Sequence, residues 1–386
     1  MASTPSTTGS ARRWALAVLI ALWALVVVAP VVVFVPVVPG WAAIISGLVT
    51  SFSAWMVVPA LVGIGLAVVV RRLGWHWVFA GVVVGVVAAL VASALPFAAA
   101  LRTAVDNGVA MWLPAYVGAP PTPTGPDATE VYATVGGEQL KLDVWRPDRP
   151  AAGNPAIVWV HGGGFVRGHR NQVPVRNQWF TDQGYTVFDI EYRLSPPPRW
   201  DLQASDVKCA IGWVAQRSEQ YGVDHISVGG DSAGGNLALM AAYTTGTGAY
   251  PPSCPVPEQR PTSVVALYPP TDMVELDHTS GIRSVVEHVD AKHFGGTPQT
   301  VPEAFRISSP VNYVRPGLPP TLLVHGASDH LVPAAQSTIL RDRLTAAGVL
   351  NRTLLVPWAD HAFDIRWGSW PTQLSYGVMG QFLTPH

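Results

Sequence analysis

Charge is almost absent from the N-terminal part of this 386-residue chain. Residues 1–105 contain no Asp, Glu or Lys, and their full charges come only from Arg12, Arg13, Arg71, Arg72 and Arg102. Over the whole chain, 24 basic residues balance 25 acidic residues, which gives no electrostatic argument for binding nucleic acid. We therefore expect no nucleic-acid partner.

Long apolar runs lie between these arginines. The runs cover residues 14–38, 41–70 and 77–101, whereas a helix needs only about 20 apolar residues to cross a bilayer. They predict a membrane domain over residues 1–104, with three transmembrane helices at about 14–38, 45–70 and 77–101. A cleaved signal peptide could explain the first run, but it would not remove the other two.

The second run is longer than one span requires. Ser51 and Ser53 lie inside it, and we expect them at a membrane interface or at a break in the helix.

The arginine pairs indicate how the spans are oriented. Arg12-Arg13 precede the first run and Arg71-Arg72 separate the second from the third. With the N-terminus in the cytoplasm, both pairs lie on the cytoplasmic side, as the positive-inside rule requires. We therefore predict a multi-pass protein of the cell membrane whose remaining chain lies on the outer face.

Cysteine is as scarce as charge, since the chain has only Cys209 and Cys254. An outward-facing domain would allow these two residues to form a disulfide. The sequence cannot place their Cα atoms within bridging distance, and Cys209 could equally be a small buried apolar side chain.

The texture of the sequence changes after a Pro-, Gly- and Thr-rich linker at residues 105–128. Charges of both signs appear over residues 129–386, and short apolar runs predict strands at 139–145, 156–160, 185–191, 226–229, 263–267, 320–324 and 352–356. Segments of helical period lie between them at 206–221, 233–243 and 334–347. Alternating strands and helices predict a mostly parallel sheet with helices on both faces.

A nucleophile motif follows the strand predicted at 226–229. Gly230-Asp231-Ser232-Ala233-Gly234 has the G-x-S-x-G pattern of a sharp strand-to-helix turn that exposes a serine oxygen. Ser232 is therefore our candidate nucleophile. The pattern alone is weak, because Gly- and Ser-rich turns without chemistry are common.

A glycine loop follows the strand predicted at 156–160. His161-Gly162-Gly163-Gly164 is an HGGG motif, whose amides can stabilise the oxyanion that forms during acyl transfer. We expect the oxyanion hole to consist of the amides of Gly163, Gly164 and Ala233. His161 is expected to shape this loop and not to act as a base.

Asp329 and His361 follow the strands predicted at 320–324 and 352–356, at the same sheet edge as Ser232. The order Ser, Asp, His along the chain is typical of α/β-hydrolases, with His361 as general base and Asp329 orienting its ring. Rivals for these roles are His325 and His330 as base, and Asp360 and Asp364 as acid.

Two segments have no assigned chemistry. Residues 167–178 are predicted as a polar loop and 272–309 as an insertion, and either segment could cover the site as a lid or form only surface structure. The insertion contains His278, His288 and His293, which lack metal-ligand spacing and are expected at the surface. We expect no metal and no cofactor.

These motifs together resemble the hormone-sensitive-lipase-like esterases. The resemblance covers about residue 129 to the C-terminus and rests on HGGGF (161–165), EYRLSP (191–196), GDSAGG (230–235), HGASDHLV (325–332) and DHAFD (360–364). The stretch QLKLDVWRP (139–147) is similar to the related feruloyl-esterase-type branch. Ser195-Pro-Pro-Pro198 departs from the Ala-Pro-Glu that the family often has. The resemblance implies an α/β-hydrolase fold, a Ser–Asp–His triad and cofactor-free hydrolysis of carboxylic esters.

The sequence thus predicts a membrane-anchored serine hydrolase that cleaves a small-molecule or lipid ester through an acyl-enzyme. The same site could serve an amidase, a formamidase or an acyltransferase acting on envelope lipid or polysaccharide. A non-catalytic binding module built on a decayed hydrolase domain is the alternative from another class. The sequence does not indicate the oligomeric state.

Overall fold

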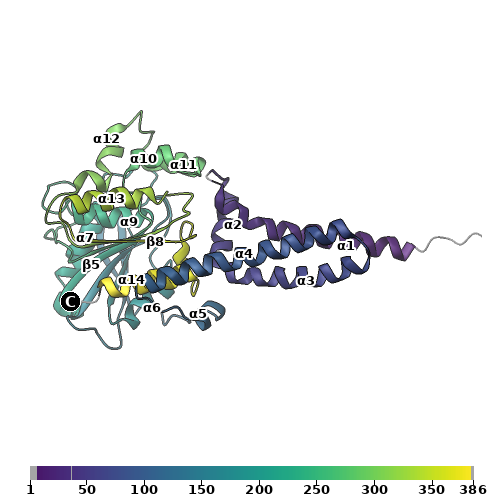
Figure 1. Cartoon of the computed structure of the whole chain (residues 1–386). Helices are drawn as coiled ribbons and strands as arrows, with labels where there is room; N and C mark the ends of the chain where they lie inside the picture. The colour runs from purple at the N-terminus through teal and green to yellow at the C-terminus, as the bar shows by residue number, and fades with distance from the viewer. Residues whose placement is uncertain (1–6, 36, 384–386) are drawn as a thin grey trace, which may run out of the picture.

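The computed structural model describes residues 7–35 and 37–383. Residues 1–6, 36 and 384–386, which fall within the predicted membrane and catalytic domains, lie outside the described residues. Figure 1 shows a slender helical bundle attached to a broader α/β domain.

The bundle contains the apolar N-terminal helices. They are α1 (Thr7–Val28), η1 (Ala29–Phe34), α2 (Gly40–Ser51), η2 (Ser53–Met56), α3 (Val57–Arg72) and α4 (His76–Asp106). The stretches Ala11–Phe34, Ser53–Arg72 and His76–Asp106 are long and apolar enough to cross a membrane.

The helices differ from the predicted spans in one respect, because the second apolar run is divided. Its first part forms α2, which ends at Ser51, and only the part from Ser53 onward is long enough to span. The break is held from outside the bundle, since the Ala54 amide donates to the Tyr116 hydroxyl at 3.0 Å.

Trp23 packs into the bundle through close contact with two glycines. Its indole N–H donates to the Pro59 carbonyl at 2.7 Å. A Cβ on Gly63 would lie 2.6 Å from the Trp23 ring, and one on Gly85 would lie 2.3 Å from it. Small residues that let helices approach closely are typical of helix packing in membranes.

The helix α4 continues beyond the bundle. Its 31 residues extend about 46 Å, whereas the hydrocarbon core of a bilayer is about 30 Å thick. The C-terminal part of α4 lies along the α/β domain. Phe97 there contacts Trp370 with ring centroids 5.3 Å apart, and Ala100 and Ala104 belong to a core cluster of that domain.

One eight-stranded sheet forms the centre of the α/β domain in the described residues, with the strand order β1-β2-β4-β3-β5-β6-β7-β8. The strands are β1 (Ala128–Val135), β2 (Glu138–Trp145), β3 (Pro155–Val160), β4 (Thr186–Ile190), β5 (His225–Asp231), β6 (Val264–Leu267), β7 (Thr321–Gly326) and β8 (Asn351–Val356). The strands from β4 through β3 to β8 are parallel to one another. The strand β2 pairs antiparallel with both of its neighbours, β1 and β4. The predicted mostly parallel sheet is confirmed, and β1 is an additional strand that the sequence reading missed.

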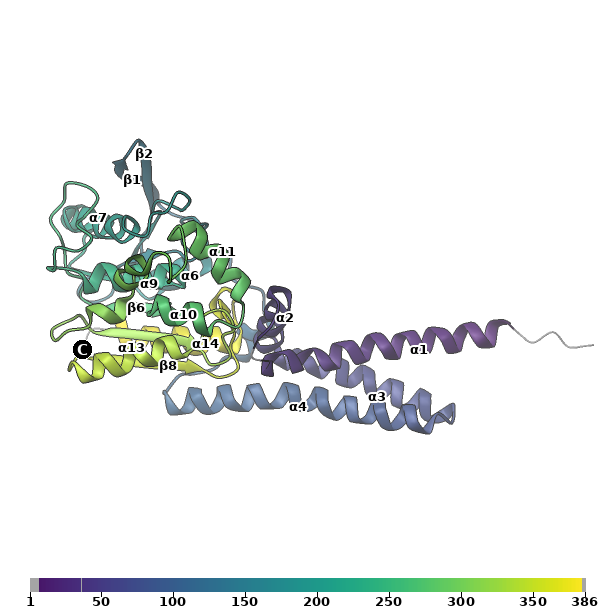
Figure 2. The same ribbon diagram turned by 90° about the horizontal axis from the view of Figure 1, so that it is seen from above.

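Alternate side chains of the strands pack into two cores, one on each face. Val158 and Val160 belong to the core on one face, while Ile157 and Trp159 belong to the other. The domain's helices are α6 (Pro174–Asp182), α7 (Gln203–Ala215), α8 (Ser218–Tyr221), α9 (Ala233–Tyr243), α10 (Met273–Thr279), α11 (Arg283–His293), α12 (Pro302–Ile307), η3 (Pro310–Tyr313), α13 (Ala335–Ala346), η4 (Phe363–Ile365) and α14 (Trp370–Leu383). The helices α7, α9 and α13 cover the first face, and α6 and α14 cover the second (Figures 1 and 2).

The two cysteines form a disulfide, the pairing that the sequence left open. Cys209 on α7 bonds to Cys254 with a Cα–Cα distance of 5.5 Å, within the ordinary bridging range.

Candidate active site

Ser232 occupies a strained turn between β5 and α9. Its backbone has φ 54° and ψ −121°, a combination that residues with a side chain rarely adopt. The turn is held by a hydrogen bond from its amide to the Leu267 carbonyl at 2.8 Å. Gly234 permits this geometry, because a Cβ there would lie 2.1 Å from the Val160 carbonyl oxygen.

A chain of hydrogen bonds connects Ser232, His361 and Asp329. His361 Nε2 lies 3.0 Å from Ser232 Oγ, and His361 Nδ1 lies 2.7 Å from Asp329 Oδ2. The amides of Leu331 and Val332 donate to Asp329 Oδ1 at 2.9 and 2.8 Å. The structure therefore brings together the three side chains singled out from the sequence.

The electrostatics of this chain favour a charged carboxylate and a basic imidazole. Burial acts to raise the pKa of Asp329, but His361 and His325 outweigh it and hold this pKa well below its ordinary value. Burial acts to lower the pKa of His361, but the Asp329 carboxylate raises it above the ordinary value of histidine.

The rival side chains have other partners. Asp360 accepts from the ring Nδ1 of His330 at 2.7 Å and from the backbone amide of His361 at 2.7 Å. His330 Nε2 lies 3.0 Å from the Val35 carbonyl oxygen, so both of its ring nitrogens face acceptors, an arrangement that favours the doubly protonated ring. Consistently, the hydrogen bond to Asp360 raises the pKa of His330. His325 lies between Ser337 Oγ and the Val332 carbonyl, at 2.7 Å from each.

The glycine loop after β3 lies beside Ser232. Gly163 and Gly164 have φ values of +122° and +62°, which favour glycine. Within the described part of the chain, the amides of Gly163, Gly164 and Ala233 donate to no backbone or side-chain oxygen. These three residues and Ser232 line the same pocket.

His161 contacts the loop itself. Its Nδ1 lies 2.7 Å from the Gly162 carbonyl, and its ring stacks on Tyr192 with centroids 4.4 Å apart. Burial lowers the pKa of His161.

A buried cation lies beneath the turn, and the sequence reading missed it. Arg176 is 1% exposed, and its Nη1 lies 3.1 Å from Asp231 Oδ1 and 3.0 Å from Asp364 Oδ2. Asp231 also accepts from the Gly162 amide at 3.1 Å and from the Trp159 indole at 3.1 Å. This carboxylate therefore ties the glycine loop to the residue that precedes Ser232.

The prediction of a polar loop at 167–178 was wrong in its last part. The helix α6 begins there at Pro174, and its Arg176 side chain points into the core. Proline at the first position of a helix is the sequence signal that could have identified it.

The insertion predicted at 272–309 forms one wall of the pocket. The pocket has a volume of about 630 Å³ and is lined from α10 and α11 by apolar side chains, namely Met273, Leu276, Val285, Val286 and Val289. Such a size and lining are typical of a small-molecule site.

The three histidines of this insertion behave differently. His278 and His288 are exposed, and His288 lines the pocket. The surface prediction was wrong for His293, which is buried and stacks on Phe165 with ring centroids 4.1 Å apart. Burial lowers the pKa of His293 to about 3, so it is neutral. Across the described residues, no cluster of His, Cys, Asp or Glu is arranged to hold a metal ion.

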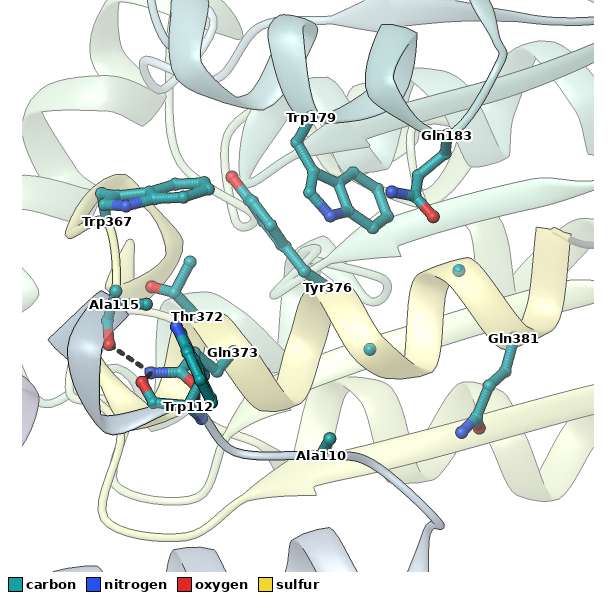
Figure 3. Close-up of a pocket in the computed structure, with 13 residues that line it drawn as sticks. Ala110, Trp112, Ala115, Trp179, Gln183, Trp367, Thr372, Gln373, Tyr376 and Gln381 are labelled. Atoms are coloured by element: carbon teal, nitrogen blue, oxygen red, sulfur yellow. Dashed lines mark hydrogen bonds between the residues drawn. The ribbon is translucent and has the colours of Figure 1, made fainter. Parts of the chain in front are cut away.

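Another cavity, of about 400 Å³, lies where the linker meets α14 (Figure 3). It shares no lining residue with the pocket at Ser232. Gln373 exchanges hydrogen bonds with the backbone of Trp112, and Gln381 donates to the carbonyls of Asn107 and Gly108. These side chains therefore hold the linker on the domain.

The sheet and the geometry at Ser232 define an α/β-hydrolase fold. Residues 142–344 match the BD-FAE family, and the chain belongs to this family. The matched range includes Ser232 and Asp329 and ends before His361.

Similar curated proteins include esterases of Mycobacterium tuberculosis. Esterase LipC is 33% identical over 232 residues, which are 58% of this chain and 57% of LipC. Esterase LipQ is 32% identical over 238 residues, which are 60% of this chain and 56% of LipQ. The chain thus spans little more than half the length of these relatives.

Two solved structures resemble the α/β domain. A truncated carbohydrate esterase from gut microbiota has a TM-score of 0.57 and 22% identity, over 68% of this chain and 98% of that chain, and supports the fold. Esterase 2 of Thermogutta terrifontis has a TM-score of 0.50 and 26% identity, over 63% of this chain and 85% of that chain.

Proposed function

We propose that this protein is a membrane-anchored esterase that hydrolyses carboxylic esters with Ser232 as nucleophile. The observation that supports it best is the hydrogen-bonded chain from Ser232 through His361 to Asp329, at the wall of an apolar pocket. The kinship with esterases supports the same reaction class.

The reaction proceeds in two acyl transfers. Ser232 Oγ attacks the ester carbonyl carbon while His361 Nε2 takes the serine proton, and Asp329 stabilises the resulting imidazolium. The amides of Gly163, Gly164 and Ala233 bind the oxyanion. The leaving alcohol takes the proton from His361, and an acyl group remains on Ser232.

Water completes the cycle. His361 takes a proton from the water molecule as its oxygen attacks the acyl carbon, and it returns that proton to Ser232 Oγ as the acid leaves. No co-reactant besides water is needed.

The anchor in this proposal consists of the three apolar stretches. The N-terminal end of α1 and the connection between α3 and α4 lie at the end of the bundle away from the α/β domain (Figure 1). Because Arg12, Arg13, Arg71 and Arg72 fall at that end, the positive-inside rule makes it cytoplasmic and the α/β domain external. The disulfide supports an oxidising compartment. Protease added to intact cells should cut the α/β domain, whereas cleavage only in inverted vesicles would refute this orientation.

The test of catalysis uses the full chain in detergent. The parent protein should hydrolyse an aryl butyrate and take up a fluorophosphonate label, and Ser232→Ala should lose both. Ser218→Ala, a matched serine change on α8 outside the pocket, should retain both. Full ester hydrolysis by a folded Ser232→Ala variant would overturn the proposal, and faster turnover of matched amides would change the bond that is cleaved.

A further inference from the structure

The carboxyl edge of the sheet faces the membrane helices. The Val35 carbonyl, just after η1, accepts the hydrogen bond from His330, in the loop that follows β7. The Phe34 ring lies edge-on to Trp358, in the loop that follows β8, with centroids 5.2 Å apart. The edge that carries Ser232 is therefore the edge that meets the bundle.

The wall of the pocket at Ser232 continues into two apolar residues around the start of α2, Val38 and Ala42. Val38 and Ala42 form a buried apolar cluster with Ile282 of the insertion at 272–309. Val285 and Leu331 pack against this cluster, and both also line the pocket. An apolar wall thus continues from the reacting serine to α2.

The exposed end of this wall also lies beside α2. Ile365 lines the pocket, yet it is 50% exposed, so the pocket reaches the surface there. The next side chain, Arg366, lies against Gly47 of α2, where a Cβ would be 3.1 Å from the guanidinium.

The helix α2 itself presents an apolar face to the surroundings. Trp41, Ile44 and Leu48 are 67%, 61% and 45% exposed, and their i, i+3, i+7 spacing puts them on one side of the helix. With 12 residues, α2 extends about 18 Å and is too short to span a bilayer. It lies between the bundle and the α/β domain, where the membrane surface would be (Figures 1 and 2).

We propose that the substrate is a lipid ester resident in the outer leaflet, which enters the pocket beside α2. The exposed face of α2 sits in the lipid, and the acyl chain follows the apolar wall of Val285, Leu331 and Ile365 toward Ser232. This inference rests on the proposed esterase function and adds the substrate class and its route. The chemistry remains the acyl transfer described above.

The test compares two substrates on the full chain in phosphatidylcholine vesicles. One is a water-soluble aryl butyrate, and the other is a fluorogenic diacylglycerol embedded in the same vesicles. Ile44→Asp puts a charge on the lipid-facing side of α2. It should lower the rate on the diacylglycerol by about tenfold relative to the rate on the butyrate, because an apolar contact of this size is lost.

The matched control is Leu350→Asp, which charges a residue that is 70% exposed before β8, away from α2. It should leave the ratio of the two rates unchanged. Ile44→Asn, which adds no charge, should lower the ratio in the same direction and serves if the aspartate variant does not assemble. An unchanged ratio in an assembled Ile44 variant would overturn the route.

The outcomes separate this inference from the proposed function. If Ser232→Ala leaves butyrate hydrolysis intact, the esterase proposal itself is wrong. If butyrate hydrolysis depends on Ser232 but the parent protein does not cleave the embedded diacylglycerol, only the lipid inference is wrong.

Discussion

Replacing Arg176 with Met should reveal the energetic cost of the two buried carboxylates under the nucleophile turn. Arg176 pairs with Asp231 and Asp364 at 3.1 and 3.0 Å and is 1% exposed. Removing one partner of a buried ion pair typically costs about 3–5 kcal/mol, because a buried charge is left without compensation. Asp231 keeps the Trp159 and Gly162 donors, whereas Asp364 keeps the Tyr268 hydroxyl. We therefore expect Asp364 to take up a proton.

The cost of that proton can be worked out. An aspartate with an unfolded pKa of about 3.9 costs about 4 kcal/mol to protonate at pH 7 and about 1.5 kcal/mol at pH 5. In the variant, the folded pKa of Asp364 is raised above the unfolded value, so the folded state binds more protons and loses stability as the pH rises. In the parent protein, burial already raises this pKa although Arg176 opposes it. The deficit of the variant relative to the parent should therefore widen from pH 5 to pH 7.

The assay is thermal unfolding of the full chain in detergent at the two pH values. The full cost corresponds to a melting temperature lowered by roughly 10 °C at pH 7 and roughly 4 °C at pH 5, and these are upper limits because the raised pKa of Asp364 in the parent already carries part of it. The control is Arg341→Met, which removes a surface pair with Asp342 whose side chains are 41% and 68% exposed, and it should shift neither value. A deficit that is the same at both pH values would refute the reasoning.

Three further predictions concern the site and the disulfide. Gly163→Ala should lower kcat by about 10²–10³-fold in the ester assay, because its Cβ would lie 2.0 Å from a backbone oxygen and the loop must move; a loss below threefold would contradict this. Asp329→Asn should lower kcat by about 10⁴-fold. It should also move the acidic limb of the pH–rate profile to lower pH, because the carboxylate that raises the pKa of His361 is gone; an acidic limb that stays in place would argue against this pairing. Cys254→Ser should cost about 2–4 kcal/mol in thermal unfolding, since the bond to Cys209 closes a loop of 45 residues. Reductant should reproduce this loss in the parent protein and have no effect on the variant.

The positions of seven strands along the chain could be predicted because their signal is local. Seven short apolar runs correspond to β2 through β8, and each is bounded by turn residues that can be recognised in the sequence. The strand β1 has no such run, since Ala128–Val135 is an exposed edge strand with alternating burial, stabilised by its pairing with β2. Its existence depends on a neighbour and not on its own composition.

The candidate site divides in the same way. The glycine spacing of the motifs and the order of Ser, Asp and His along the chain can be read directly from the sequence. They identified Ser232, Asp329 and His361 as the candidate catalytic side chains. The roles of Asp360, His330 and Arg176 depend on contacts between distant segments, such as the one between Arg176 and Asp364, which are 188 residues apart. Sequence adjacency made Asp360 a rival of Asp329 as the acid, but its side chain accepts from the ring of His330, while the His361 ring pairs with Asp329.

Three apolar stretches, followed by an α/β domain with a serine turn and a glycine loop, could be recognised in the sequence alone. Each of these features depends on a short stretch of residues, either on the length of an apolar run or on the backbone geometry that a glycine motif favours. Tertiary packing was needed to show that the break expected near Ser51 does divide the second run, that the two cysteines pair, and that the serine edge of the sheet meets the apolar N-terminal helices. These features arise from packing between segments that are far apart in the chain. A local sequence pattern does not show which distant segments will contact one another.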